Sequence, residues 1–410
     1  MKKLGCFLLA LTVLLSLASC AELKEGEMIV LTPESRVTSP IMTTASAPEE
    51  TTAPPSIDPP VNEEVSISFL ACGDNIIHTN VYSDAKERAG AGQEYDFVPM
   101  YNGIAERVQK ADIAFINHES PIGGRDMGIS GYPTFNSPEE AGRALAEVGF
   151  DVVNIANNHM LDKWEKGYAN SLAFWDTVDV LTVGGYTKAD YDTIRLLEKD
   201  GITIAFLSYT YNFRQSNGTY LPENSSLQVP YINDADIVRQ LALAKEQADL
   251  VLVSMHWGVE NQFTPSAEQK RVAKLCADNG ADAIIGHHPH VVQPIEWIEG
   301  QDGHRMLCVY SLGNVISTMM YGQYMTGTMI SFDIVGKKDV LSIENVLAIP
   351  TVTHYTMARR GLQVYEMEDY SASLAAEHGC LADDPKFTFD RAKKYITDTI
   401  DGAFLPDFLK

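Results

Sequence analysis

Residues 65–74, VSISFLACGD, decide the fold of this 410-residue chain, because they join a strand-length apolar run to a polar end. The run is rich in β-branched and apolar residues, and it stops at Gly73 and Asp74, as strands commonly do. Similar runs follow along the chain at 113–117, 152–155, 180–183, 202–208, 250–255, 283–285, 306–311 and 328–335. They predict a protein built on β-sheets, whose folded part starts at Val65.

Helical patterns lie between several of these runs. Residues 137–140, SPEE, read as an N-cap, a proline at the first helical position and a capping-box glutamate, which predicts a helix to Val148. Strands that alternate with helices indicate an α/β architecture. The strands after Val291 suggest that a second, more antiparallel sheet is added late. Further helices are predicted at 162–175, 234–247 and 264–280, the last of them opened by Thr264-Pro265.

The composition is that of a globular protein with an acidic surface. Apolar residues make up 45% and charged residues 21% of the chain, which excludes a collagen-like, a wholly disordered and a multi-pass membrane protein. Asp and Glu number 55 against 31 Lys and Arg, which gives a formal net charge of −24. Such a surface repels phosphate backbones, so we expect no nucleic-acid partner and no basic membrane-binding patch.

The N-terminus has the features of an export signal. Lys2 and Lys3 precede an apolar run at 4–17, which is shorter than the roughly 20 residues that span a bilayer. The run ends in LASC at 17–20, which resembles the bacterial lipobox, where the cysteine is lipidated. We therefore predict a lipoprotein signal peptide at 1–19 and lipid attachment at Cys20, which places the protein at the extracytoplasmic face of the cell membrane. An ordinary signal peptide with a chance cysteine is the alternative.

Residues 20–64 differ in character from the rest of the chain. Seven prolines lie among Thr, Ser and Glu, and no aromatic residue occurs. Such a segment buries too little apolar surface to offset the entropy of ordering, and its prolines keep it extended. It is predicted to be a stalk between the lipid anchor and a folded domain at 65–354, with a disordered tail as the alternative. Residues 355–410 look helical and acidic and carry no interpretable motif.

The remaining cysteines are predicted to be buried thiols. Cys72, Cys276, Cys308 and Cys380 lie far apart and lack the spacing of metal-binding cysteine pairs. Cys72 and Cys308 fall in strand-like apolar runs, which favours burial as free thiols. One disulfide remains as the alternative.

Polar residues gather where the strand-like runs end. Seven of the ten histidines lie in five such clusters. Because α/β sheets place ligands at the carboxyl ends of their strands, Asp, Glu, Asn and His at five ends in turn predict a metal site. Solvated loops would use Lys, Ser and Gly more often. The clusters are GDNIIH at 73–78, NHESP at 117–121, NIANNHMLD at 154–162, MHWGVE at 255–260 and GHHPH at 286–290, with YSLGN at 310–314 as a sixth.

The donor types select the metal and the chemistry. Carboxylates with imidazoles and one amide suit divalent Mn, Zn, Fe, Mg or Ca. Two such ions bridged by a carboxylate would activate water and clamp an oxyanion. His288 and His290 straddle a proline, so an extended backbone would point both side chains to one face. Asn117 and Glu119 likewise share a face, which leaves His118 on the other as a structural residue.

Together these clusters resemble a known family. The motifs GDxxxH, NxExP, NxANNHxxD, HWGxE, GxHPHVxQ and YSLGN, over about residues 65–320, are similar to those of the CapA family of capsule-biosynthesis proteins, also called poly-γ-glutamate synthesis proteins. That family is related to calcineurin-like metallophosphoesterases. The resemblance implies an α/β (α+β) fold, a two-sheet αββα sandwich of the metallophosphoesterase type, with two divalent metal ions bound at 65–354.

The resemblance also implies roles for individual residues. His159 would be the general acid, and Asp162 would orient it. Two positions depart from the family pattern: Ile76 stands in place of a histidine, for which His78 is predicted to substitute, and the bridging carboxylate is a glutamate. The implied metal ligands are Asp74, His78, Glu119 (bridging), Asn158, His256, His288 and His290.

Two further residues are weaker candidates for substrate contact. Arg214, in the loop at 209–217, and Asn314, at a strand end, could face the metal site. Ordinary loop and strand-end roles are the alternative for both. Removal of Lys2 and Lys3 with the signal takes the net charge from −24 to −26, so the mature protein repels polyanions except where metals or Arg214 offset the charge.

Three functions fit these patterns. The first is a membrane-anchored metal-dependent hydrolase that acts in capsule or poly-γ-glutamate synthesis or export. The second is a non-catalytic tethered component of a polymer assembly or export complex, with a structural metal site. Both have the membrane, through the lipid anchor, and an anionic envelope polymer or the capsule synthesis machinery as partners. A solute-binding lipoprotein is the third, although it would not need the Asn-His-x-x-Asp cluster.

Overall fold

The computed structural model describes residues 64–213, 218–338 and 340–410, which belong to one compact unit. The predicted signal peptide at 1–19, the lipid-attachment residue Cys20 and the stalk up to residue 63 lie outside the described residues. Within the described ranges, no helix combines the length and the apolar character needed to cross a membrane.

The first sheet has a parallel half and an antiparallel half. Its strand order is β16-β15-β14-β1-β2-β3-β4, and the short β13 (Asn314–Ile316) pairs with the end of β1. The parallel strands are β1 Val65–Asn75, β2 Ile113–His118, β3 Val152–Asn154 and β4 Leu181–Val183. The antiparallel strands are β14 Thr326–Lys337, β15 Val340–His354 and β16 Gln363–Glu366.

The second sheet has parallel strands at its centre and antiparallel strands at its edges. Its order is β11-β12-β10-β9-β7-β6. The parallel strands are β7 Ile202–Thr210, β9 Leu250–His256, β10 Ala283–His287 and β12 Arg305–Val309. The edge strands are β6 Arg195–Lys199 and β11 Ile295–Glu299, and a separate pair is formed by β5 Tyr186–Thr187 and β8 Leu227–Gln228.

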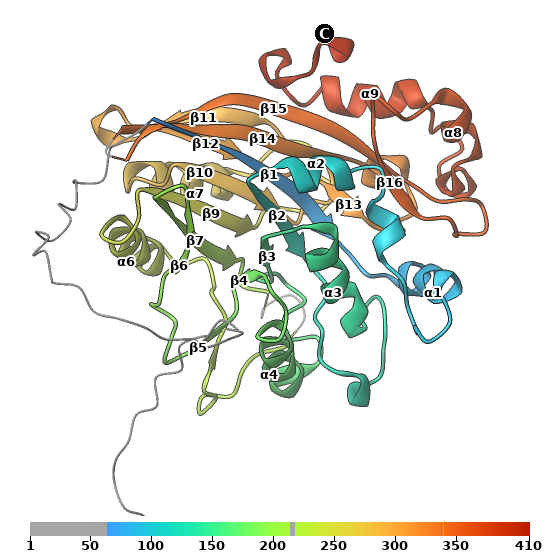
Figure 1. Cartoon of the computed structure of the whole chain (residues 1–410), viewed down its shortest axis with the longest axis horizontal. Helices are drawn as coiled ribbons and strands as arrows, with labels where there is room; N and C mark the ends of the chain where they lie inside the picture. Colours follow the sequence, from blue (N-terminus) through green and yellow to red (C-terminus); the bar gives the residue numbers. More distant parts are fainter. Residues whose placement is uncertain (1–63, 214–217, 339) are drawn as a thin grey trace, which may run out of the picture. The chain divides into compact units, whose positions relative to one another are not determined.

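Helices flank the two sheets (Figure 1). The first four are α1 Thr79–Arg88, α2 Ala105–Lys110, α3 Glu139–Val148 and α4 Trp164–Trp175. The later ones are α6 Asp234–Lys245, α7 Ala267–Asp278, α8 Ala372–Glu377 and α9 Phe389–Thr397. Short 3₁₀ helices occur at Val98–Tyr101, Arg125–Met127, Gln301–Gly303, Gly322–Tyr324, Gly379–Ala382, Gly402–Phe404 and Asp407–Leu409.

The alternation of side chains along β7 shows why the sheets stack. Ile204 and Phe206 point into the core between the sheets, where the ring of Phe206 stacks on that of Phe115 with centroids 6.5 Å apart. Ala205 and Leu207 point the other way and pack in the apolar cluster that α6 and α7 complete. Parallel strands buried on both faces need cover on each side. The arrangement confirms the predicted αββα sandwich.

Every predicted strand is present, but two predicted helix starts are wrong. Pro138, not Ser137, is the N-cap of α3, and the Ser137 hydroxyl finds no hydrogen-bond partner in the described structure. Helix α7 begins after Ser266, which forms a capping box with Gln269, rather than at Thr264-Pro265. A reciprocal pair of side-chain bonds at Ser266 satisfies two free backbone N–H groups, which a proline start does not.

The sequence suggested that the late strands form a separate antiparallel sheet, and this expectation is wrong. Strands β14 to β16 extend the first sheet, and β11 and β12 extend the second. Strand β16 and helices α8 and α9 fall inside the segment 355–410, which was predicted to be helical. Its apolar residues, among them Tyr370 and Ile396, belong to the same core as β1. The segment is therefore integrated into the fold.

The four cysteines of the described residues are buried free thiols, as predicted. Cys72 on β1 and Cys308 on β12 both belong to apolar clusters. Burial raises the pKa of the Cys276 thiol to about 12, so that thiol stays protonated at neutral pH.

A bulge at Gly73 aims the end of β1. The register of β1 against β2 shifts between Cys72 and Asp74, and the backbone N–H of Asp74 donates to the carbonyl of Gly313 (2.9 Å). A Cβ on Gly73 would collide with that same carbonyl oxygen. Bulges of this kind redirect a side chain at functional sites. Gly73 thus lets the backbone of β1 approach Gly313 closely enough to fix Asp74.

We predict that Gly73→Ala lowers the free energy of unfolding by about 1–3 kcal/mol, since the added methyl group forces β1 and Gly313 apart. Urea denaturation of the purified protein measures this change. Gly402→Ala is the matched control, because a Cβ there meets nothing within 4 Å. Equal stability of the two variants would contradict the close-approach argument.

Candidate metal centre

The carboxyl ends of the parallel strands of both sheets meet at one place. β1 and β2 bring Asp74 and Glu119, and β9 and β10 bring His256 and the histidines that follow. The backbone N–H of His288 donates to the carboxylate of Asp74 (3.2 Å), a contact that joins the two sheets directly. Polar residues at these strand ends are therefore neighbours, as their positions in the sequence predicted.

Two groups of potential metal ligands share Glu119. In each group the ligand atoms lie within 4.8 Å of one another, and all the residues are buried. The amide oxygen of Asn158 lies 2.9 Å from Nε2 of His256 and joins the second group. Glu119 has the shared position that the resemblance assigned to a bridging carboxylate. The groups are Glu119, His288 and His290, and Asp74, Glu119 and His256.

Several buried polar atoms of these residues lack a hydrogen-bond partner within the described part of the chain. Both carboxylate oxygens of Glu119 and the Nδ1 atoms of His256 and His288 are buried and unpaired. A buried carboxylate without a donor costs several kcal/mol unless a cation or a proton compensates it. Carboxylate and imidazole donors in this number fit a divalent cation, so the residues present are compatible with metal binding.

The pKa values of the clustered residues are shifted by burial and by their mutual charges. Burial raises the pKa of Glu119 well above its ordinary value. Burial alone would lower the pKa of His290, but the carboxylates of Glu119 and Asp74 raise it to about 9. Burial opposes ionisation of Asp74 as well, yet the neighbouring His287 (3.4 Å) and the hydrogen bond with His290 hold its pKa well below the usual range. The shifts of Glu119 and His290 both favour a bound proton, with which a metal ion would compete.

The backbone of the His-Pro-His segment is not extended, so that expectation is wrong. His288 has a φ of 97° and His290 a φ of 58°. Left-handed backbone costs a non-glycine residue about 1–3 kcal/mol and persists mostly at functional sites. Both rings nevertheless reach the cluster, and Nδ1 of His290 lies 3.2 Å from Asp74. The strained turn, rather than strand alternation, aims the two histidines.

His159 lies beside the ligands without belonging to either group. Its Nδ1 donates to the carboxylate of Asp162 (2.8 Å), which also accepts from the backbone N–H of Phe135 (2.7 Å). The side chain of His159 is 15% exposed, whereas that of His256 is fully buried. The structure thus brings His159 and Asp162 together with His159 open to solvent.

His78 is placed outside both groups. It is the N-cap residue of α1, and its Nδ1 accepts from the backbone N–H of Thr318 (3.4 Å). Its ring contacts Phe135 edge-on, with centroids 5.4 Å apart. The strand β1 ends at Asn75, and His78 belongs to neither ligand group. The predicted replacement of the missing family histidine therefore finds no support in the geometry.

Three further residues were singled out from the sequence: Asn314, His118 and Arg214. Asn314 is buried and lies behind His290, with its amide oxygen 3.1 Å from Nδ1 of that histidine. Its amide nitrogen donates to the carbonyl of Tyr324 (3.0 Å), so the side chain holds a ligand rather than facing outward. His118 contacts Asn75 (3.0 Å) and Trp175, away from the ligands, as expected of a structural residue. Arg214 lies outside the described residues.

Comparison with known proteins identifies the family. Residues 68–319 match the family model described as "Bacterial capsule synthesis protein PGA_cap". The chain belongs to this family. The match confirms the resemblance seen in the six motifs, and it covers every residue of the two ligand groups.

Curated relatives of this PGA_cap member include two proteins from Bacillus. Over 186 residues the chain is 34% identical to the capsule biosynthesis protein CapA of Bacillus anthracis. This aligned stretch covers 44% of this chain and 43% of that protein. It is 33% identical to the PGA biosynthesis protein CapA of Bacillus subtilis, over 43% of this chain and 45% of that protein. The chain thus matches less than half the length of these relatives.

Solved structures resemble the PGA_cap member only loosely. The calcineurin-like phosphoesterase YfkN of Bacillus subtilis superimposes with a TM-score of 0.42 at 11% identity, over 81% of this chain and all of that one. The NAD nucleotidase NadN of Haemophilus influenzae superimposes with a TM-score of 0.45 at 12% sequence identity. The superposition covers 84% of this chain and 58% of NadN.

Sequence reasoning missed a supporting layer of amides. Asn117 donates to the carboxylate of Asp74 (2.8 Å), and Asn154 donates to the amide oxygen of Asn117 (2.7 Å). Ser208 on β7 donates in turn to Asn154, so the chain of bonds crosses from one sheet to the other. Asparagines at the ends of β2 and β3 were the available signal. Such partners fix the orientation of ligands.

Metal affinity should rise with pH, because a ligand must be deprotonated to bind. With a pKa of about 9, metal-free His290 is protonated below that pH, and binding must displace its proton. We predict release of about one proton from His290 at pH 7, and tighter binding toward pH 9. Calorimetric titration with Mn²⁺ or Zn²⁺ in buffers of different ionisation enthalpy measures the proton release.

His304→Ala is the control for this experiment. His304 donates to the carbonyl of Ala281 (2.6 Å), at the opposite end of β10, and should leave proton release unchanged. His290→Ala should reduce it. Affinity independent of pH between 6 and 9 would contradict the assignment of His290 as a ligand.

Proposed function

We propose that this chain is a membrane-anchored, extracytoplasmic protein of capsule or poly-γ-glutamate synthesis or export, and that its folded unit is a two-metal hydrolase. Family membership supports the role in polymer synthesis. The observation that carries the hydrolase proposal is the pair of ligand groups sharing Glu119, with the His159–Asp162 pair beside them.

Two divalent ions, of Mn, Zn, Fe, Mg or Ca, would be bound by these ligand sets. One ion would be held by Glu119, His288 and His290, and the other by Asp74, Glu119, His256 and Asn158. When bound, such ions supply an activated water and a Lewis acid for an oxyanion. The amides of Asn117 and Asn154 keep Asp74 oriented for this task.

His159 is suited to protonate a leaving group. Its Nδ1–H is committed to Asp162, which fixes the ring and leaves Nε2 to hold and deliver a proton. Asp162 is itself fixed by the backbone N–H of Phe135. The partial exposure of His159 lets a substrate reach it, whereas the ligands stay buried.

The proposed metal site and the His159–Asp162 pair together suit a hydrolytic reaction. A phosphoester, or an amide or ester of the cell envelope, would be cleaved by attack of water with protonation of the leaving group. Polyanionic polymer would approach a chain of net charge −24 only where local positive charge compensates the repulsion.

A non-catalytic component of a polymer assembly or export complex is the second candidate. It is favoured by one observation: Ile76 replaces the expected histidine, and His78 lies outside both ligand groups. A site with one ligand fewer binds metal but positions water less strictly. Full biological function of a His159→Ala protein would favour this candidate.

The division of labour between neighbouring residues tests the hydrolase proposal. We predict that His159→Ala keeps its metal and loses turnover by roughly 100- to 10,000-fold, the range for removal of a general acid. Asn158→Ala should lose metal as well as activity, and Asp162→Asn should lose less activity than His159→Ala. Metal analysis and a panel of phosphoester, ester and amide substrates measure these effects, with His304→Ala as the control. Equal metal loss in the Asn158 and His159 variants would refute the assignment.

The lipid anchor makes a separate prediction. Cys20→Ala should release the protein from membranes into the soluble fraction, because acyl chains supply the attachment energy. Fractionation after a high-salt wash, followed by immunoblotting, measures the distribution. Cys72→Ala is the control, since that thiol is buried in the core. A Cys20→Ala protein that stays in the membrane fraction after the wash would rule out lipidation at this residue.

A further inference from the structure

A cation lies beyond the residues matched by the family model. Arg359 occupies the turn between β15 and β16, with a left-handed φ of 56°. Its guanidinium lies over the ring of Tyr355 (5.9 Å to the centroid), donates to the carbonyl of Thr318 (3.3 Å) and pairs with Asp383 (3.1 Å). The side chain is 30% exposed. Arg359 is therefore held in place but accessible.

The turn that carries Arg359 is fixed to α1. Asp84 on α1 is buried and accepts from the backbone N–H groups of Gly361 (2.9 Å) and Leu362 (3.0 Å). Arg88 on the same helix donates to the carbonyl of Leu362 (2.7 Å). His78 is the N-cap residue of α1, so these bonds tie Arg359 and His78 to the same helix.

Contacts lead step by step from Arg359 to the proposed general acid. Thr318 accepts from Arg359 through its carbonyl and donates its N–H to Nδ1 of His78 (3.4 Å). The ring of His78 contacts that of Phe135, which in turn contacts the ring of His159 at 4.7 Å. The hydroxyl of Thr318 is buried and has no hydrogen-bond partner among the described residues. A polar group at Thr318 is thus unused beside the metal centre.

We propose that His78, Thr318 and Arg359 form a subsite that binds an anionic group of the substrate, a carboxylate or a phosphate, next to the metal centre. Its position rests on the proposed function, but binding of the anion does not require turnover. The planar guanidinium offers five N–H donors in a fork that matches both anions, and the contacts above use two of them.

His78 contributes a neutral donor to this subsite. Because Nδ1 accepts from Thr318, the neutral ring carries its proton on Nε2, from which it can donate. Burial, with smaller effects from His290, His159 and Arg359, lowers the pKa of His78 to about 3, so the ring is neutral at physiological pH. The positive charge of the subsite therefore comes from Arg359.

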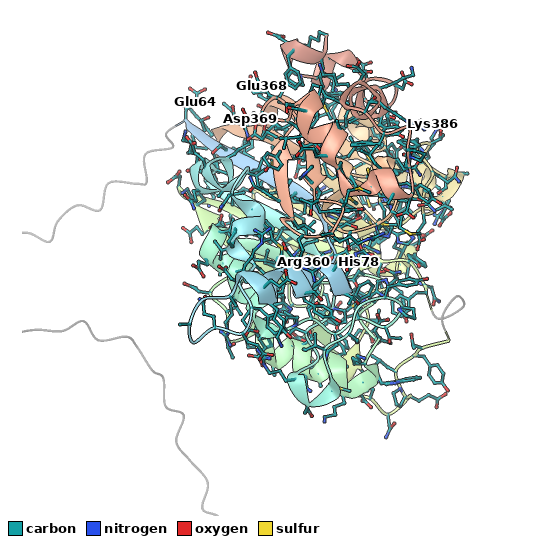
Figure 2. All side chains as sticks on the ribbon, turned by 90° about the vertical axis from the view of Figure 1, so that its right-hand side faces the viewer. Glu64, His78, Arg360, Glu368, Asp369 and Lys386 are labelled. Atoms are coloured by element: carbon teal, nitrogen blue, oxygen red, sulfur yellow. The ribbon has the colours of Figure 1, made fainter. Side chains whose placement is uncertain are left out.

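Two neighbouring residues provide informative variants. Asp383 competes for the guanidinium, so Asp383→Asn should free Arg359 and tighten anion binding. Arg360, the next residue, pairs with Glu87 on α1 (2.7 Å) and is a control of equal charge and similar exposure. Figure 2 shows His78 and Arg360 on the same face of the molecule.

Calorimetric titration of the metal-loaded protein tests the subsite. The probes are a short γ-linked oligoglutamate, its neutral analogue in which the free α-carboxylates are amides, and inorganic phosphate. Arg359→Gln should weaken binding of the preferred anion about tenfold or more, the loss expected for one charge-assisted contact, and Arg359→Lys should restore part of it. Arg360→Gln should change it less than about twofold, and Asp383→Asn should strengthen it. The anion that is more sensitive to Arg359→Gln identifies the source, carboxylate or phosphate.

Several results would overturn the proposal. These are equal losses in Arg359→Gln and Arg360→Gln, equally tight binding of the neutral amide, or no binding of either anion by the wild type. Thermal melts show whether Arg359→Gln is folded, and if it is not, Asp383→Asn and Arg359→Lys decide. His159→Ala should bind the anions as the wild type does. Anion binding that depends on Arg359 in a protein without hydrolase activity would refute the proposed reaction and leave the subsite intact.

Discussion

A carboxylate buried without a hydrogen-bond donor is the constraint on which this molecule depends. Glu119 is buried, and in the described structure neither of its oxygens has a donor. Water cannot solvate it, so cations or protons must compensate its charge. Three histidines and a second carboxylate lie close enough to complete such a site, and amides brace them from behind. The two-sheet fold serves this arrangement, because each sheet alone carries only part of the ligand set.

Much of this could be predicted from sequence, because the signals are local. Apolar runs of strand length marked the parallel strands, and polar residues at their ends marked the ligands. Strand β15 was missed: its first half is half-exposed or exposed, so it lacks the continuous apolar run of a buried strand. The left-handed backbone at His288 and His290 could not be predicted, since it is imposed by contacts with the other sheet. Arg359 was missed because no motif marks the segment that carries it.

The residues matched by the family model include the ligand groups but not the whole of the proposed anion subsite. The matched residues 68–319 contain both ligand groups, His159 and Asp162. The turn that carries Arg359 lies beyond that match, although β15 and β16 place it in the same sheet as Asp74. His78 and Thr318 of the proposed subsite lie within the matched residues, so only its positive charge, Arg359, would come from outside them. Relatives could share the ligand groups and differ at the position of Arg359.

The pairing of β1 also governs when the centre can form during synthesis. Val65 at the start of β1 is aligned with Gly336, so the first strand of the folded unit waits for one of the last. Until β14 is available, β1 has no neighbour on one edge along Val65–Ala71. Asp74 is held on that side by Gly313 and β13, which directly precede β14. Pairing across such a distance in sequence is slow and leaves apolar surface open meanwhile. The ligand groups therefore cannot be fully assembled before residues 313–337 are available to pair with β1.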